Sequence, residues 1–104
     1  MEIKILDSAL EKFIESLPKP TIAKVLRTID LLEELGPNLG MPHTKKILPR
    51  LFELRIRGIQ EIRIFYTFHK AKIYLLHGFI KKSKKIPKKE IDTALEKLKK
   101  LDTV

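Results

Sequence analysis

The spacing of hydrophobic residues in the first third of the chain predicts a short strand followed by two helices. Residues 2–6 largely alternate between polar and apolar side chains, which is typical of a strand. Apolar residues then recur every three or four positions along residues 8–17 and again along residues 20–35. Asp7 or Ser8 can cap the first helix, and a Pro-Lys-Pro turn separates the two. We therefore expect an antiparallel helix pair that covers one face of a sheet.

The middle of the chain changes to a period of two, which is the period of a β-strand. Residues 36–50 contain three prolines and two glycines without a consistent period, so we expect a loop with His43 as an ordinary exposed residue. Residues 51–57 and 61–68 alternate between apolar and polar side chains and predict two half-buried strands. Residues 73–80 are almost continuously apolar, which indicates a third, buried strand whose faces the pattern cannot assign.

A last helix is expected to begin at Pro87, with Ile91, Ala94 and Leu98 on its apolar side. The resulting order predicts an α+β domain in which an N-terminal strand and a two-helix hairpin pack on an antiparallel sheet, with a C-terminal helix. In this arrangement the helices cover one face of the sheet and leave the other face free. A length of 104 residues with 43% hydrophobic content suits a single domain over residues 1–104.

The positive charge of the chain is concentrated in residues 41–89, which contain the predicted central strands. The formal net charge is +9, and it divides into −2 for residues 1–40, +12 for residues 41–89 and −1 for residues 90–104. Such a concentration of cations favours a polyanionic partner, with nucleic acid ahead of a membrane surface.

Arginines occupy the polar sides of the two alternating strands. Arg55 and Arg57 lie on the first strand, Arg63 lies on the second, and the aromatic Phe65 follows on the same side. Guanidinium groups match phosphate oxygens, and an aromatic ring beside them can stack on a base. The alternative is a solvated face with cross-strand ion pairs such as Arg57 with Glu61.

Several kinds of chemistry are disfavoured by what the sequence lacks. It has no cysteine, no glycine-rich phosphate loop and no His/Cys metal constellation, so we expect no metal site and no cofactor. RNA can be cleaved without a metal, because its own 2′-hydroxyl can attack the adjacent phosphate. That reaction needs a base, cations that stabilise charge on phosphorus, and an acid for the leaving oxygen.

Four short segments in and beyond the predicted sheet occur together. They are LFELR at 51–55, RIFY at 63–66, LLHGFIKK at 75–82 and IPKKEI at 86–91. This combination resembles the phage-derived, HigB-type branch of the RelE/ParE toxin superfamily, and the resemblance covers almost the whole chain. It implies a RelE-like fold and the toxin of a type II toxin–antitoxin system. The implied activity is that of an mRNA interferase, a ribosome-dependent and metal-independent endoribonuclease that blocks translation.

The resemblance also implies roles for individual residues. Arg55 lies where RelE-like enzymes have a strand lysine, and Arg63 lies where their strand arginine contacts the scissile phosphate. Lys81 or Lys82 lies near their second catalytic basic position, and His77 or Lys82 is the candidate for proton transfer. The further RNA-binding candidates are Arg57, Phe65, Lys84 and Lys85.

The chain departs from the RelE pattern at two points. Glu53 stands where RelE has another lysine, and the C-terminal segment lacks the tyrosine that RelE places there. These departures leave the identities of the base and the acid open.

The implied partners are mRNA on the ribosome and a cognate antitoxin, expected to be a helix-turn-helix protein that covers the basic face. No apolar run approaches the roughly 20 residues of a membrane span, and no signal peptide is evident, so we expect a cytoplasmic protein without a membrane partner. Two alternatives remain open. One is a ParE-like toxin that inhibits DNA gyrase without nuclease activity, and the other is a non-catalytic nucleic-acid-binding module.

Overall fold

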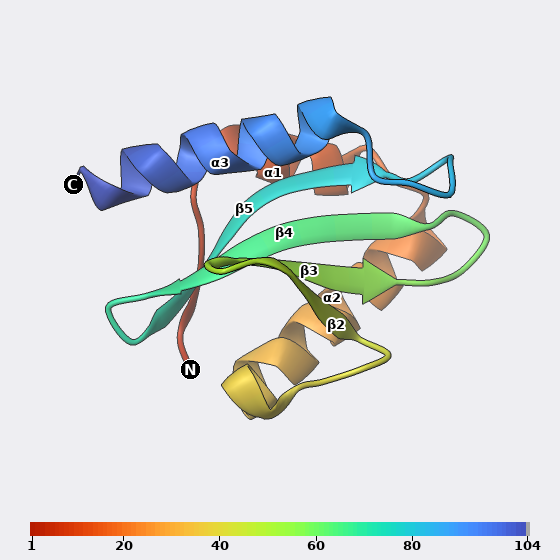
Figure 1. The fold of residues 1–104 in the computed structure, drawn as a ribbon. Coiled ribbons are helices and arrows are strands. Elements are labelled where there is room, and N and C mark those ends of the chain that lie inside the picture. Colours follow the sequence, from red (N-terminus) through yellow and green to blue (C-terminus); the bar gives the residue numbers. More distant parts are fainter. Residues whose placement is uncertain (104) are drawn as a thin grey trace.

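The computed structural model describes residues 1–103 and has the predicted α+β architecture (Figure 1). The N-terminal strand, the two-helix hairpin, the central strands and the C-terminal helix are all confirmed. In chain order the elements are β1 (Ile3–Ile5), α1 (Ser8–Glu15), α2 (Lys19–Leu35), the 3₁₀ turn η1 (Gly36–Asn38), β2 (Thr44–Leu48), β3 (Leu51–Ile56), β4 (Ile62–His69), β5 (Lys72–Ile80) and α3 (Lys88–Asp102).

The strands form one five-stranded sheet in the order β1-β5-β4-β3-β2. Strands β2 to β5 are antiparallel neighbours, as expected for strands joined by short turns. Strand β1 pairs in parallel with β5, with Ile3 opposite Ile73. The sheet is therefore mixed rather than purely antiparallel.

The prediction of a loop over residues 36–50 was wrong for residues 44–48, which form β2. Thr44 pairs with Leu54 and Lys45 pairs with Glu53, while Lys45 and Lys46 are both exposed. Strand β2 lies at the edge of the sheet, and lysines on an edge strand keep it from pairing with another chain. Consecutive lysines hid the period of two from the sequence pattern.

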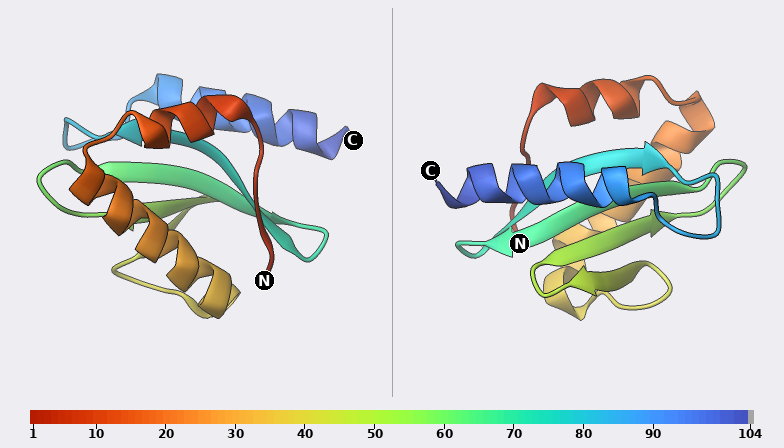
Figure 2. Two further views of the ribbon diagram at one scale, coloured as in Figure 1. Left: turned by 180° about the vertical axis from the view of Figure 1, so that it is seen from behind. Right: turned by 45° about the horizontal axis from the view of Figure 1, so that its top comes forward.

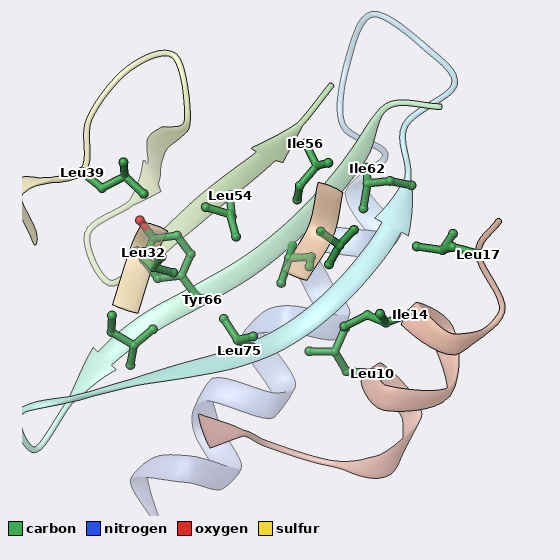
Figure 3. Packing of buried hydrophobic residues seen from close by; sticks show 13 residues of the cluster. Leu10, Ile14, Leu17, Leu32, Leu39, Leu54, Ile56, Ile62, Tyr66 and Leu75 are labelled. Atoms are coloured by element: carbon green, nitrogen blue, oxygen red, sulfur yellow. The ribbon is translucent and has the colours of Figure 1, made fainter. Parts of the chain in front are cut away.

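The prediction that one face of the sheet is free was also wrong. Helices α1 and α2 pack on one face and α3 packs on the opposite face (Figure 2). Figure 3 shows the first core, in which Leu10 and Ile14 of α1 face Leu75 of β5. The second core lies under α3 and contains Leu51, Phe65, Leu76, Phe79, Ala94, Leu98 and Leu101.

Helix α1 begins at the predicted cap. The side chain of Asp7 accepts a hydrogen bond from the backbone N–H of Leu10 at 3.2 Å and forms an ion pair with Lys97 of α3 at 3.0 Å. Burial raises the pKa of the Asp7 carboxyl, but the hydrogen bonds with Lys97 and Leu10 outweigh it and lower the pKa below 3.8. Asp7 thus joins the start of α1 to α3.

An irregularity in β5 determines which of its side chains face α3. Phe65 pairs with His77, but the next residue, Tyr66, pairs with Leu75, so Leu76 is an extra residue in β5. Such a bulge bends the strand and redirects side chains. Leu76 belongs to the core under α3, and its neighbour His77 contacts the same helix.

Gly78 allows α1 to lie close against β5. A Cβ atom at this position would lie 2.9 Å from Leu10 Cδ1 and 2.9 Å from two ring carbons of Phe13. We expect Gly78→Ala to lower the free energy of unfolding by about 1–3 kcal/mol, because the overpacked side chains must shift. Chemical denaturation measures the loss.

Gly40→Ala is the matched control, because a Cβ atom there meets nothing within 4 Å. Equal stabilities of the Gly78→Ala and Gly40→Ala proteins would contradict the close approach of α1.

Among residues 1–103, no helix has both the length and the apolar character needed to cross a membrane.

Candidate functional site

The face of the sheet that carries α3 also bears several of the ionisable residues singled out from the sequence. Pairing places Arg55 of β3 opposite Arg63 of β4, and Arg63 opposite Phe79 of β5. Two positions away along the strands, Glu53 of β3 pairs with Phe65 of β4, and Phe65 pairs with His77 of β5. We use the term sheet site for the ionisable side chains of this region, which are Glu53, Arg55, Glu61, Arg63, His77 and Glu90.

Glu53 lies at the centre of the sheet site between two arginines. Its Oε1 accepts a hydrogen bond from Arg55 Nε at 2.9 Å, and its Oε2 lies 3.5 Å from Arg63 Nε. The side chains of Glu53 and Arg63 are only 1% and 3% exposed. Oε2 of Glu53 and Nε of Arg63 have no hydrogen-bond partner within residues 1–103, so their contact is electrostatic. The acid that departs from the RelE pattern thus organises the two strand arginines.

Arg63 is enclosed by protein groups. Its Nη2 donates to Glu61 Oε1 and its Nη1 to the carbonyl oxygen of Ile62, both at 3.2 Å. This arrangement counts against direct contact of Arg63 with a phosphate. Glu61 therefore forms its ion pair with Arg63, two residues along the same strand segment, and the cross-strand pairing with Arg57 considered from the sequence is not observed among the described residues.

Arg55 is more exposed than Arg63. Its side chain is 14% exposed, and within the described chain only its Nε takes part in an ion pair. The two Nη groups form no hydrogen bond and no ion pair within the described chain. Glu53 therefore holds Arg55 in place without occupying its whole guanidinium group.

His77 of β5 pairs with Glu90 in the first turn of α3. The distance from His77 Nε2 to Glu90 Oε1 is 3.1 Å, and the two side chains are 19% and 18% exposed. A histidine oriented by a carboxylate is suited to accept and return a proton. Strand spacing places His77 about 10 Å from Glu53, two strands away.

Glu90 was not identified as a site residue from the sequence. It occurs in the IPKKEI segment, but 13 positions separate it from His77. Their contact depends on α3 folding back over β5, and no local spacing encodes that step. The only signal was an acidic residue in the first turn of a helix, which by itself is common.

The position of Phe65 contradicts its predicted role as a base-stacking residue. Phe65 is fully buried, and its ring centroid lies 5.4 Å from that of Phe79 under α3. It therefore has no exposed ring face for stacking on a base. Tyr66, the next residue, belongs to the first core on the opposite face and is 2% exposed. Burial raises the pKa of the Tyr66 phenol, against a smaller opposing effect of the Thr44 hydroxyl.

The lysines that follow β5 lie in the loop between this strand and α3. The backbone N–H of Lys81 donates to the carbonyl oxygen of Glu61 at 2.8 Å, which holds the start of the loop beside the sheet site. Lys81 is half-buried, while Lys82, Lys84 and Lys85 are exposed. None of the four forms an ion pair with another residue of the described chain. The loop is therefore a source of uncompensated positive charge.

Arg57 lies apart from the other strand arginines. It follows the last residue of β3, is exposed, and its carbonyl oxygen accepts a hydrogen bond from Lys24 Nζ of α2 at 3.4 Å. The structure thus brings Arg55, Arg63 and His77 onto one sheet face and turns Arg57 toward α2. Over residues 1–103, no three His, Asp or Glu side chains are grouped in a way that could hold a metal ion.

The element order and sheet topology define a RelE-like fold. The family model of the phage-derived Gp49-like proteins (DUF891) matches residues 12–99. The chain therefore belongs to the Gp49-like family of phage-derived proteins. No curated protein gives a significant match.

Proposed function

We propose that this protein is the toxin of a type II toxin–antitoxin pair and acts as a HigB-type, ribosome-dependent and metal-independent mRNA endonuclease. Membership of the Gp49-like family and the RelE-like fold support the class. The observation that carries the proposal is the sheet site, where the His77–Glu90 pair and the partly exposed Arg55 share one face of the sheet.

The proposed reaction uses His77 as the base. When Nε2 carries the hydrogen of the contact with Glu90, Nδ1 is free to accept the proton of the attacking 2′-hydroxyl. The bond from the 2′-oxygen to phosphorus forms and the bond to the 5′-oxygen breaks, which leaves a 2′,3′-cyclic phosphate. Lys81 or Lys82 returns a proton to the leaving 5′-oxygen.

Arg55 stabilises the additional negative charge on the phosphate in this scheme. Arg63 and Glu53 act as positioning residues, because Arg63 is buried and reaches Arg55 through their shared carboxylate. The exposed Lys84 and Lys85 attract the RNA backbone, and the reaction takes place in the cytoplasm, on the ribosome.

Cleavage of a defined message in a purified translation system tests the proposal. We expect the wild-type protein to produce fragments ending in a 2′,3′-cyclic phosphate. His77→Gln is expected to lower the rate by about 10²–10⁴-fold, the usual contribution of a general base. Arg55→Ala is expected to lower it by about 10²–10³-fold through lost charge stabilisation.

Lys12→Ala is the control, because Lys12 is exposed on α1 and lies outside the sheet site. Intact message after incubation with wild-type protein, or equal cleavage by the His77→Gln and Lys12→Ala proteins, would refute the assignment.

The burial of Arg63 favours a second candidate function. An arginine enclosed by Glu53 and Glu61 suits a structural role, which is compatible with a ParE-like toxin that inhibits DNA gyrase or with a module that only binds nucleic acid. DNA damage without message cleavage on induction supports the gyrase inhibitor. Salt-sensitive RNA or DNA binding without products supports the binding module.

A toxin of this type requires a cognate antitoxin. The uncompensated lysines of the loop between β5 and α3 suit an antitoxin with an acidic surface. Co-expression with a small helix-turn-helix protein encoded by the neighbouring reading frame should relieve growth arrest and yield a stable complex.

A further inference from the structure

A cavity beside Arg55, next to α2, is lined by ionisable side chains that are all basic. It has a volume of about 360 Å³ and lies between α2, the end of β3 and the segment before β2. We call it the α2 pocket. Its lining residues are Lys24, Arg27, Thr28, Leu31, Pro42, His43, Arg55, Ile56 and Arg57.

The α2 pocket is assembled from three segments that are distant in sequence. Lys24 and Arg27 are three positions apart on α2, so both project from one face of the helix. Lys24 Nζ donates to the carbonyl oxygen of Arg57 at 3.4 Å, which ties the helix to the end of β3. The backbone N–H of Arg55 donates to the carbonyl oxygen of His43 at 2.8 Å and fixes the third segment.

No acidic residue lines the α2 pocket to balance its basic side chains. Within residues 1–103, Lys24, Arg27 and Arg57 form no ion pairs, in contrast to Arg55, which contacts Glu53. Like charges held together in a concave site repel one another, and an anion relieves that repulsion. Guanidinium groups that line a cavity can bind phosphoryl oxygens through paired N–H donors.

We propose that the α2 pocket binds a phosphoryl group of single-stranded RNA, held by Lys24, Arg27 and Arg57. Arg55 belongs both to this pocket and to the sheet site, so it connects the two. An RNA strand that crosses the C-terminal end of β3 places one phosphate at the sheet site and another in the α2 pocket. The choice of RNA as the ligand rests on the proposed function, but binding here does not require cleavage, so the binding test and the cleavage test fail separately.

Binding to the isolated full-length chain tests the inference in the absence of ribosomes. The probes are sodium phosphate and a single-stranded hexauridylate, added at constant ionic strength to protein labelled with ¹⁵N. We expect the backbone amide signals of Lys24, Arg27 and Arg57 to shift on addition of the oligonucleotide. Lys24→Ala/Arg27→Ala is expected to weaken oligonucleotide binding by about tenfold or more, because two charged contacts are lost. The slope of log K against log salt should fall by about 1.4, or about 0.7 for each phosphate contact on a single strand.

The matched control is Lys12→Ala/Lys99→Ala, which removes the same charge from exposed positions on α1 and α3 outside the pocket. Shifts with both probes indicate that a phosphoryl group alone suffices, and shifts with the oligonucleotide alone indicate that a strand is needed. Shifts with sodium phosphate alone assign the pocket to a small phosphate-bearing ligand and overturn the RNA assignment. Unchanged signals with both probes, equal weakening in the control variant, or an equal response to polyglutamate would also overturn it.

Discussion

Glu53→Ala should lower the free energy of unfolding by about 3–5 kcal/mol, because it leaves a buried charge without its partner. Arg63 is 3% exposed and depends on Glu53 and the more exposed Glu61 for compensation. Removal of a carboxylate that is itself 1% exposed also leaves space that water cannot readily fill. Urea denaturation monitored by circular dichroism measures the loss.

A double variant separates the buried charge from the loss of packing. Glu53→Leu/Arg63→Leu removes both charges at similar volume, and we expect it to be more stable than Glu53→Ala, as is common when buried ion pairs are replaced by apolar residues. The control is Glu2→Ala, whose ion pairs with Lys4 and Lys72 are exposed and contribute at most about 1 kcal/mol. Equal stabilities of Glu53→Ala and Glu2→Ala would contradict the central position of Glu53.

Phe65→Ala should also destabilise the protein by about 3–5 kcal/mol, the usual cost of truncating a buried phenylalanine. Phe65 is fully buried and packs against Phe79 in the core under α3. The substitution distinguishes a core residue from a base-stacking platform. A stacking residue would lose RNA affinity and keep its stability, whereas the structure predicts lost stability first.

Ile59→Ala serves as the comparison, because Ile59 is fully exposed in the turn between β3 and β4 and should change stability by less than about 0.5 kcal/mol. A Phe65→Ala protein that is as stable as Ile59→Ala but deficient in RNA binding would restore the stacking interpretation.

The local periodicity of apolar residues was sufficient to predict most of the helices and strands. The helical spacing along residues 8–35 predicted two helices and the alternation along residues 51–68 predicted two strands, and these elements are confirmed. The strands were expected to be half-buried, but β4 is buried on both faces. The pattern failed at β2, where Lys45 and Lys46 on opposite faces of an edge strand erase the alternation. The prediction that all helices cover one face was wrong for α3, because the side chains on both faces of β5 are apolar and the pattern does not distinguish the two faces.

The site was predicted less completely because its geometry depends on contacts between distant segments. Arg55 and Arg63 were identified from residue type and strand position, His77 was identified through the resemblance to RelE-like toxins, and the three do share one sheet face. Their environments were not predictable, since Glu53 neutralises Arg63 and Glu90 reaches His77 only through the docking of α3. Phe65 was assigned to the polar side by alternation alone, and α3 makes that side of the sheet a second core.

The charged contacts at the two ends of α3 also define where the helix lies along β5. Glu90 in its first turn contacts His77, and Asp102 at its last residue accepts two hydrogen bonds from Arg50 at 2.7 and 2.9 Å. A slide by one helical turn of about 5.4 Å would break both contacts at once and move Ala94 and Leu98 off the residues they cover. These contacts fix the register of α3 at both of its ends, so the side of the sheet site that α3 forms keeps constant dimensions.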